Sequence, residues 1–334
     1  MRQMRRVLPL LALTISLAAA APAHAATPPV KHVFIVVLEN ENFDSTFAAN
    51  SKAPYLSKTL RSRGAFLSQY YGTAHLSLPN YIAMTSGQGP NPVTQSDCQF
   101  YQEFAPGTIG PDGQAVGQGC LYPATVKTIA DQLEAKGLDW KGYMEDMQSS
   151  CLHPGVNSKD GTQSAKVGNQ YAARHNPFVY FRSIIDRPVC SSNDVPLDRL
   201  QGDLATNSVG SYNFITPNLC NDGHDEPCVD GRPGGLASMD EFLKLWVPRI
   251  TGSKAYKDGG LLMVTFDEAE ADETSGSGDA SSCCDEPAGP NTPNNGGPTP
   301  GNGGGLTGAV LLSPYIAPGT VTATPYNHYS MLRS

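Results

Sequence analysis

The strongest constraint on the fold is a run of apolar, mostly β-branched residues near the start of the chain, "VKHVFIVVLEN" at residues 30–40. Apolar residues do not alternate with polar ones here, so both faces of a strand would be buried, as in a parallel sheet covered by helices. Similar runs, "GLLMVTFDEAEAD" and "GLTGAVLLSPYIAPG", occupy residues 260–272 and 305–319. The three runs therefore predict buried strands of one sheet.

The segments between these runs predict helices and a further strand. Residues 53–64 and 125–137 have a helical pattern that ends in a glycine, and residues 138–146 predict a strand. Strands that alternate with helices predict an α/β domain with a largely parallel sheet. Residues 274–305 form a low-complexity loop, which is either a surface insertion or a lid beside the site.

The first 25 residues predict a signal peptide. Three arginines precede an apolar stretch, and "AHA" at residues 23–25 supplies the small residues of a cleavage site. A membrane anchor is the alternative, but the apolar stretch is short and broken. Removal of these residues lowers Lys+Arg from 23 to 20 against 31 Asp+Glu, so the net charge becomes about −11. We therefore expect a secreted protein (extracellular, periplasmic or cell-wall associated) without a transmembrane anchor, and the acidic balance argues against nucleic acid as a partner.

The eight cysteines all follow the predicted signal peptide, and an even number in an exported chain favours disulfides. Many pairings are possible, and a zinc site is the alternative, although no CxxC pair occurs. Pairing of sequence neighbours is preferred, as Cys98–Cys120, Cys151–Cys190, Cys220–Cys228 and Cys283–Cys284.

Acidic residues follow two of the predicted strands, as Glu39-Asn40 and Asp267-Glu268. Taken alone, the first pair could cap a helix and the second could be a solvated strand end. Ligands gather at the carboxyl ends of parallel strands, however, and clustered buried carboxylates call for a cation. The two acidic strand ends therefore predict a metal site.

The segment "NLCNDGHDEPC" adds Asp222, His224 and Asp225 to the candidate ligands, and His328 follows the last apolar run. The alternatives are a polar turn closed by a disulfide and a structural histidine. Imidazole together with carboxylate suits zinc, iron or manganese more than calcium.

Ser77 lies in "HLSLPNY", where Pro79 ends extended structure and a helix can begin. Its hydroxyl either caps that helix or is a nucleophile, which would need a base or a metal to become reactive. His75 lies two residues earlier on the same side of an extended segment, and His175 could contact phosphate or protonate a leaving group; each could equally be structural.

Five of these motifs resemble, in their order, the bacterial phosphoesterase family of secreted acid phosphatases and phospholipases C, which belongs to the alkaline phosphatase-like superfamily. The motifs are "HVFIVVLENENFD", "HLSLPNYIAMTSG", "NDGHD", "VTFDEAE" and "YNHYSMLRS". "YMEDM" and "RHNPFVYF" also resemble a subgroup that acts on phosphoinositides. The resemblance implies a three-layer sandwich and one phosphoesterase domain over residues 26–334. Because the family continues into a helix after "YNHYSMLRS", the chain is expected to be truncated at Ser334.

The resemblance also implies roles for individual residues. Ser77 would form a phosphoserine intermediate and Asn80 would hold a phosphate oxygen. One divalent metal would lie among Glu39, Asn40, Ser77, Asp267 and Glu268. A second metal would lie among Asp222, His224 or Asp225, and His328.

The substrate implied by the resemblance is a phosphate monoester, including phosphoinositides. A phospholipase C-type diesterase that acts on phospholipid head groups is the alternative. An inactive binding protein would have lost the candidate ligands, and a serine acyl hydrolase would carry the G-x-S-x-G glycines that are absent around Ser77.

Overall fold

The computed structural model describes residues 28–272, 277–286, 288–292 and 303–333. Its centre is an eight-stranded sheet. In spatial order the strands are β15 (Thr320–Thr322), β2 (Ala65–Leu67), β14 (Ala309–Leu312), β11 (Gly260–Phe266), β1 (His32–Leu38), β10 (Tyr212–Thr216), β7 (Trp140–Met144) and β9 (Asp194–Pro196). The predicted signal peptide lies outside the described residues.

Strand β1 lies in the middle of the sheet and is parallel to β10 and β11. Its alternate residues enter two different cores: Phe34, Val36 and Leu38 pack on one face of the sheet, and Ile35 and Val37 on the other. Burial on both faces explains why the run does not alternate with polar residues. The predicted buried strand is confirmed.

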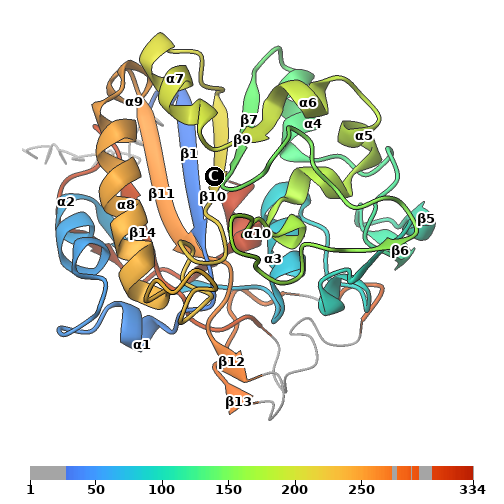
Figure 1. Ribbon diagram of the computed structural model, residues 1–334, viewed down its shortest axis with the longest axis horizontal. Coiled ribbons are helices and arrows are strands. Elements are labelled where there is room, and N and C mark those ends of the chain that lie inside the picture. Colours follow the sequence, from blue (N-terminus) through green and yellow to red (C-terminus); the bar gives the residue numbers. More distant parts are fainter. Residues whose placement is uncertain (1–27, 273–276, 287, 293–302, 334) are drawn as a thin grey trace, which may run out of the picture.

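Helices cover both faces of the sheet, which gives the predicted three layers (Figure 1). The face that includes Ile35 is covered by α3 (Ser77–Ser86), α4 (Ile129–Glu134), η3 (Ala173–His175), η4 (Pro177–Tyr180), α5 (Arg182–Ile185), α6 (Val189–Asn193) and α10 (His328–Met331). The opposite face is covered by α1 (Phe43–Thr46), η1 (Tyr55–Leu60), α7 (Arg199–Thr206), α8 (Gly235–Gly252) and α9 (Lys254–Lys257).

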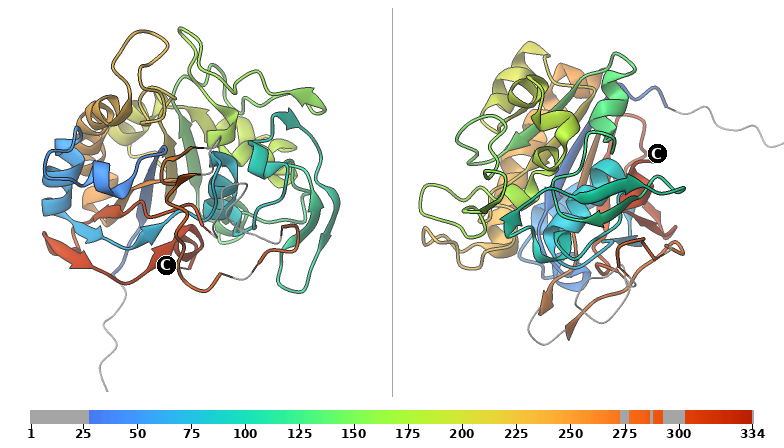
Figure 2. Two further views of the ribbon diagram at one scale, coloured as in Figure 1. Left: turned by 90° about the horizontal axis from the view of Figure 1, so that it is seen from below. Right: turned by 90° about the vertical axis from the view of Figure 1, so that its right-hand side faces the viewer.

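The remaining elements are short. They are α2 (Arg61–Arg63), η2 (Thr94–Ser96) and the ribbon strands β3 (Tyr70–Tyr71), β16 (Tyr326–Asn327), β4 (Phe100–Tyr101), β8 (Ser158–Lys159), β5 (Ala105–Ile109), β6 (Ala115–Gln118), β12 (Ala271–Asp272) and β13 (Ser277–Gly278). The β12–β13 ribbon projects from the body of the molecule in two views at right angles (Figures 1 and 2).

Two details of the sheet differ from the sequence prediction. Strand β14 is antiparallel to β11 and β2, because Gly304, shortly before β14, hydrogen-bonds Gly72 and Ala269 at the carboxyl end of β11, so β14 begins at that same edge. Strand β10, with the sequence "YNFIT", was not predicted. The other main-sheet pairings are parallel, so a largely parallel sheet is confirmed.

The predicted helices are shorter in the structure. Residues 55–63 form a π-helical turn followed by one α-helical turn. In the second segment α4 begins after Thr128, which forms a capping box with Asp131.

All four preferred disulfides are present and no cysteine is free. A zinc site made of thiolates is therefore wrong. Among the described residues, no helix has the length and apolar character needed to cross a membrane.

Candidate active site

Two buried acidic groups meet where β1 and β11 end. The strands are in parallel register, with Leu38 opposite Phe266, so Glu39 and Asp267 emerge at the same edge of the sheet. Glu39 and Asp267 are fully buried, and Glu268 is 1% exposed. The segments that follow β1 and β11, which contain α1 and β12, lie together at the lower end of Figure 1. The expected convergence of acidic strand ends is present in the structure.

Ser77 begins α3 at this edge after a strained turn. Leu76 has φ 71°, a left-handed conformation that non-glycine residues rarely adopt. The turn is held by Asn80, whose Oδ1 accepts from the backbone nitrogens of Thr73 and Ala74 at 2.9 and 3.0 Å. Its Nδ2 donates to the carbonyls of Ala74 and Leu76. The sequence predicts a phosphate contact for Asn80, whereas these bonds occupy its amide with the turn that carries Ser77.

The Ser77 hydroxyl faces two groups. It donates to Glu39 Oε2 at 3.0 Å, and His175 Nε2 lies 3.2 Å from the same oxygen. Tyr81, one turn further along α3, hydrogen-bonds the other Glu39 oxygen and stacks on the His175 ring at 5.3 Å between centroids. Tyr81 was not among the predicted site residues, although its spacing of four residues from Ser77 places it on the same helix face.

His175 links Ser77 to Asp222. His175 Nδ1 lies 3.5 Å from Asp222 Oδ2, and both residues are buried. Burial lowers the pKa of His175 well below its usual value, and the charges of Arg174 and His224 lower it further. Because the pKa is lowered, the imidazole is neutral near pH 7, and a neutral ring with its hydrogen on Nδ1 would present the Nε2 lone pair to Ser77.

Several buried oxygen atoms at this edge lack a partner. Within the described part of the chain, no hydrogen bond reaches Asn40 Oδ1, Asp267 Oδ2, Glu268 Oε1 or Asp222 Oδ2. Buried polar atoms are rarely left without a partner, and carboxylate and amide oxygens are ligands for divalent cations. Glu39, His175 and Asp222 also place one ligand atom each within 4.8 Å of one another. The residues therefore fit a divalent cation.

The carboxylates of this cluster repel one another. Burial raises the pKa values of Glu39, Asp222 and Asp267, and the charge of Glu39 raises the last two further. Burial also raises the pKa of Glu268 to about 7, against the lowering effect of His75. A cation would favour the ionised form of all four groups.

His75 contacts Glu268 and not Ser77. Its Nδ1 hydrogen-bonds Glu268 Oε2, and its Nε2 lies 3.1 Å from the carbonyl oxygen of Asp279, in the described part of the 274–305 loop. Burial alone would lower the pKa of His75, but Glu268 and Asp279 raise it above its usual value. Both ring nitrogens face acceptors, which suits a charged imidazole that orients Glu268.

His328 is not positioned as the predicted second metal set requires. Its Nε2 donates to the carbonyl oxygen of Asp267, and its Nδ1 lies 3.2 Å from the Tyr70 hydroxyl. Burial lowers the pKa of His328 to about 4, so the ring is neutral. Because both nitrogens are engaged, His328 has none left to join Asp222 in this arrangement.

His224 and Asp225 lie at the rim of the site. They hydrogen-bond each other at 2.9 Å, and the His224 side chain is 35% exposed. The backbone nitrogen of His224 donates to Asp222 Oδ1 and holds that carboxylate in place. The rings of His224 and His175 are 6.4 Å apart. His224 is therefore close enough to the site to meet a ligand that enters from solvent.

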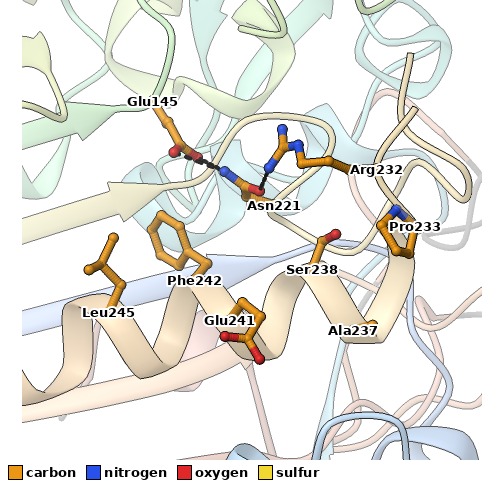
Figure 3. A pocket seen from close by; sticks show the side chains of 9 residues that line it. All are labelled: Glu145, Asn221, Arg232, Pro233, Ala237, Ser238, Glu241, Phe242 and Leu245. Carbon is orange, nitrogen blue, oxygen red and sulfur yellow. Dashed lines mark hydrogen bonds between the residues drawn. The ribbon is translucent and has the colours of Figure 1, made fainter. Parts of the chain in front are cut away.

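A separate cavity of about 430 Å³ lies between the loop that carries Asp222 and helix α8 (Figure 3). Glu145, Asn221 and Arg232 form one wall. Asn221 Nδ2 donates to both oxygens of Glu145, and Arg232 Nη1 donates to Asn221 Oδ1 at 2.7 Å. Phe242 and Leu245 of α8 lie opposite. Glu145 therefore supports the loop from outside the Ser77 cluster.

The raised carboxylate pKa values predict how stability depends on pH. Glu268 has a pKa of about 7 in the folded protein and about 4.5 when unfolded, so the folded state retains a proton that the unfolded state releases. Stability from such a group is present at low pH and is lost as pH rises through its folded pKa. We expect metal-free protein to lose stability mainly between about pH 5 and 7, from the unfolded to the folded pKa of Glu268, by up to about 1.4 kcal/mol per pH unit for each such group.

Urea unfolding at several pH values, with chelator and with added divalent cation, measures this effect. The free energy of unfolding should fall less steeply with pH when the cation is present. It should also fall less steeply in metal-free Glu268→Gln than in the metal-free unmodified protein. Glu41 and Asp194, whose pKa values burial raises to about 7, should leave a residual slope in that variant. An identical slope in Glu268→Gln and the unmodified protein would contradict the assignment to Glu268.

Comparisons with known proteins give several relatives of this chain. An acid phosphatase from Aspergillus fumigatus is 26% identical over 70% of this chain and 44% of its own length. A phosphate-repressible acid phosphatase from Penicillium chrysogenum is 31% identical over 70% of this chain and 47% of its own length. A phosphatidylinositol-3-phosphatase from Mycobacterium tuberculosis is 27% identical over 74% of this chain and 66% of its own length. The chain spans about half the length of the fungal relatives that it matches.

Among solved structures, that of Ps i-CgsB has a TM-score of 0.50 and 13% identity over 90% of this chain and 70% of that chain, which shows likeness of fold. A model of the Phosphoesterase family matches residues 49–334, most of the sequence. The family predicted from the motifs is thereby confirmed, and this chain belongs to the Phosphoesterase family.

Proposed function

We propose that this protein hydrolyses phosphate monoesters through a phosphoserine intermediate at Ser77 and uses a divalent cation. The observation that carries the proposal is the position of the Ser77 hydroxyl. It lies on a strained turn at the carboxyl edge of the sheet, 3.0 Å from Glu39 and 3.2 Å from His175, beside buried oxygen atoms that lack partners. Membership of the Phosphoesterase family supports the reaction class.

Glu39, Asn40, Asp267 and Glu268, together with Ser77 Oγ, would hold the cation. When bound, it would neutralise phosphate oxygens and lower the pKa of the Ser77 hydroxyl. These donors are all oxygen atoms, so manganese and calcium are candidates together with zinc and iron. Asp222 and His175 also lie near Glu39, but His175 is assigned to proton transfer and not to a metal.

The residues of this chain can carry out both halves of the reaction. Ser77 Oγ attacks phosphorus, its proton passes to His175 Nε2, and the bond to the leaving oxygen breaks as that oxygen receives the proton. Water then attacks the phosphoserine, passes a proton to Nε2 and displaces Oγ, which takes the proton back. The products are an alcohol, inorganic phosphate and free Ser77.

The rest of the site would position these groups. Tyr81 holds Glu39 and stacks on His175, while Asn80 fixes the turn before Ser77. The N-terminus of α3, which begins at Ser77, would face the reacting phosphate with its partial positive charge. His224 at the rim would contact the part of the substrate that extends towards solvent.

The names of the relatives favour phosphate monoesters, with phosphoinositides among the candidate substrates. The four disulfides are typical of an oxidising compartment, which supports export of the protein.

The test compares two chromogenic substrates, p-nitrophenyl phosphate and p-nitrophenylphosphorylcholine. We expect purified protein to hydrolyse the monoester, to lose this activity after chelation and to recover it with one of zinc, iron(II), manganese or calcium. The diester should react at least about tenfold more slowly, because its phosphorus carries one charge fewer for the cation and Ser77 site to recognise. Faster hydrolysis of the diester would favour a phospholipase C-type enzyme, and full activity in chelator would contradict the cation.

A further inference from the structure

Arg174 is a buried cation beside the proposed site that the mechanism above does not use. It is 5% exposed, and its Nε lies 3.6 Å from Asp97 Oδ2. Its Nη1 donates to the carbonyl oxygen of Gln163 at 3.1 Å. Burial of a guanidinium is costly unless it is paired, so this placement calls for an explanation.

The partner of Arg174 holds the helix of the proposed nucleophile. Asp97 Oδ1 accepts from the backbone nitrogen of Leu78 at 2.9 Å, in the first turn of α3 and next to Ser77. An acidic side chain at this position satisfies a free backbone donor and complements the helix dipole. Asp97 therefore connects the start of α3 to Arg174.

Arg174 also lies next to His175, the proposed proton acceptor. The η3 turn contains both Arg174 and His175. Thr162 Oγ1 accepts from the backbone nitrogen of Ala173 at 2.8 Å, and Gln163 Nε2 donates to the carbonyl oxygen of Asp97 at 2.9 Å. Two neighbouring loop residues thus hold the η3 turn and Asp97 together, and the Asp97–Arg174 pair closes the connection between Ser77 and His175.

The charge of Arg174 also reaches the carboxylates. It lowers the pKa values of Glu39 and Asp222, opposing the larger effect of burial. A neutral residue of similar size would keep the packing but lose this charge and the pairing with Asp97.

We infer that Asp97 and Arg174 form a positioning pair that fixes the Ser77 hydroxyl relative to His175. This inference rests on the proposed function, because it assigns to the pair the geometry of that nucleophile and that proton acceptor. Neither residue is expected to touch the substrate.

The test measures kcat and KM for p-nitrophenyl phosphate in Arg174→Gln, Asp97→Asn and the double variant, each loaded with the activating metal. Misplacement of reacting groups by a fraction of an ångström to 1 Å can cost about 10²-fold in rate, so we expect each single variant to lose about 10- to 100-fold in kcat. KM should change by less than about threefold, since uniform binding is not altered. Because the pair acts as a unit, the double variant should be no slower than the slower single variant. Arg174→Lys, which keeps the charge, should recover part of the loss.

Arg187→Gln is the matched control, because Arg187 pairs with Glu134 on the surface at 2.8 Å and lies outside the site. Bound metal and the thermal midpoint are measured for every variant. If Arg174→Gln does not fold, Asp97→Asn tests the same pair. Three results would contradict the inference that the pair positions Ser77. They are unchanged kcat in the folded single variants, a double variant whose loss in kcat is the product of the two single losses, and losses in kcat that follow the amount of bound metal. An unmodified protein without phosphatase activity would instead refute the proposed function.

Discussion

Ser77→Ala is expected to lower kcat for p-nitrophenyl phosphate by at least about 10³-fold, because removal of a serine nucleophile costs this much or more in enzymes with a covalent intermediate. The substitution removes one oxygen atom from a residue that is 3% exposed and whose hydrogen bonds go to other site residues. The fold should therefore survive, with a thermal midpoint within a few degrees of the unmodified protein.

Ser86→Ala is the matched control for this result. Ser86 ends the same helix, and its hydroxyl donates to the carbonyl oxygen of Ile82. The control should retain full activity. Rapid acid quenching during turnover, followed by mass spectrometry, should find a phosphoryl group on Ser77 in the unmodified protein. Substantial activity in Ser77→Ala would remove the phosphoserine mechanism while leaving the family assignment in place.

Asp267→Asn is expected to abolish stoichiometric metal binding and to lower activity by at least about 10³-fold, while making the metal-free protein more stable. Asp267 is fully buried, and no described residue partners its Oδ2. Burial and the charges of Glu39 and Glu268 raise the pKa of Asp267 well above its usual value, so its ionised form destabilises the metal-free fold. An amide removes that charge, and replacement of a buried charge in this way can stabilise a protein by about 1–3 kcal/mol.

Asp240→Asn provides the contrast, since Asp240 is 1% exposed but lies on α8 and accepts from the backbone nitrogens of Tyr55 and Leu56. It should lower the free energy of unfolding and keep both metal and activity. Elemental analysis after dialysis and urea unfolding in chelator distinguish the two cases. An Asp267→Asn protein that is less stable without metal and still binds one equivalent would show that the carboxylate has a structural role.

The sequence predicted the parts of the site that follow from regular structure. Glu39 and Asp267 could be paired in advance, because parallel strands bring their carboxyl ends to one edge. The direction of β14 could not be predicted, since an apolar run looks the same in a parallel or an antiparallel strand. His328 was assigned to a metal position from its place after a strand, and the hydrogen bond to Tyr70 that occupies its Nδ1 depends on tertiary packing.

Other features escaped prediction because they depend on irregular segments. Arg174 and Asp97 meet through two short 3-10 turns and a loop, which carry no periodicity in the sequence. Strand β10 is only five residues long, and without it the loop that carries Asp222 could not be placed beside Glu39. Asn80 was predicted to hold a phosphate oxygen, whereas its amide bonds backbone atoms of the turn before Ser77, whose positions a sequence does not reveal.

The position of β1 has a consequence for how the chain must fold. It is synthesised before the other described strands, yet its neighbours β10 and β11 come from residues 212–216 and 260–266, so its apolar edges stay unpaired until those residues are available. Folding that depends on contacts so distant in sequence is slow, and an exposed apolar strand invites association with other chains in the meantime. We expect refolding yield to fall steeply with protein concentration, and fragments that end before residue 260 to aggregate rather than form a stable subdomain.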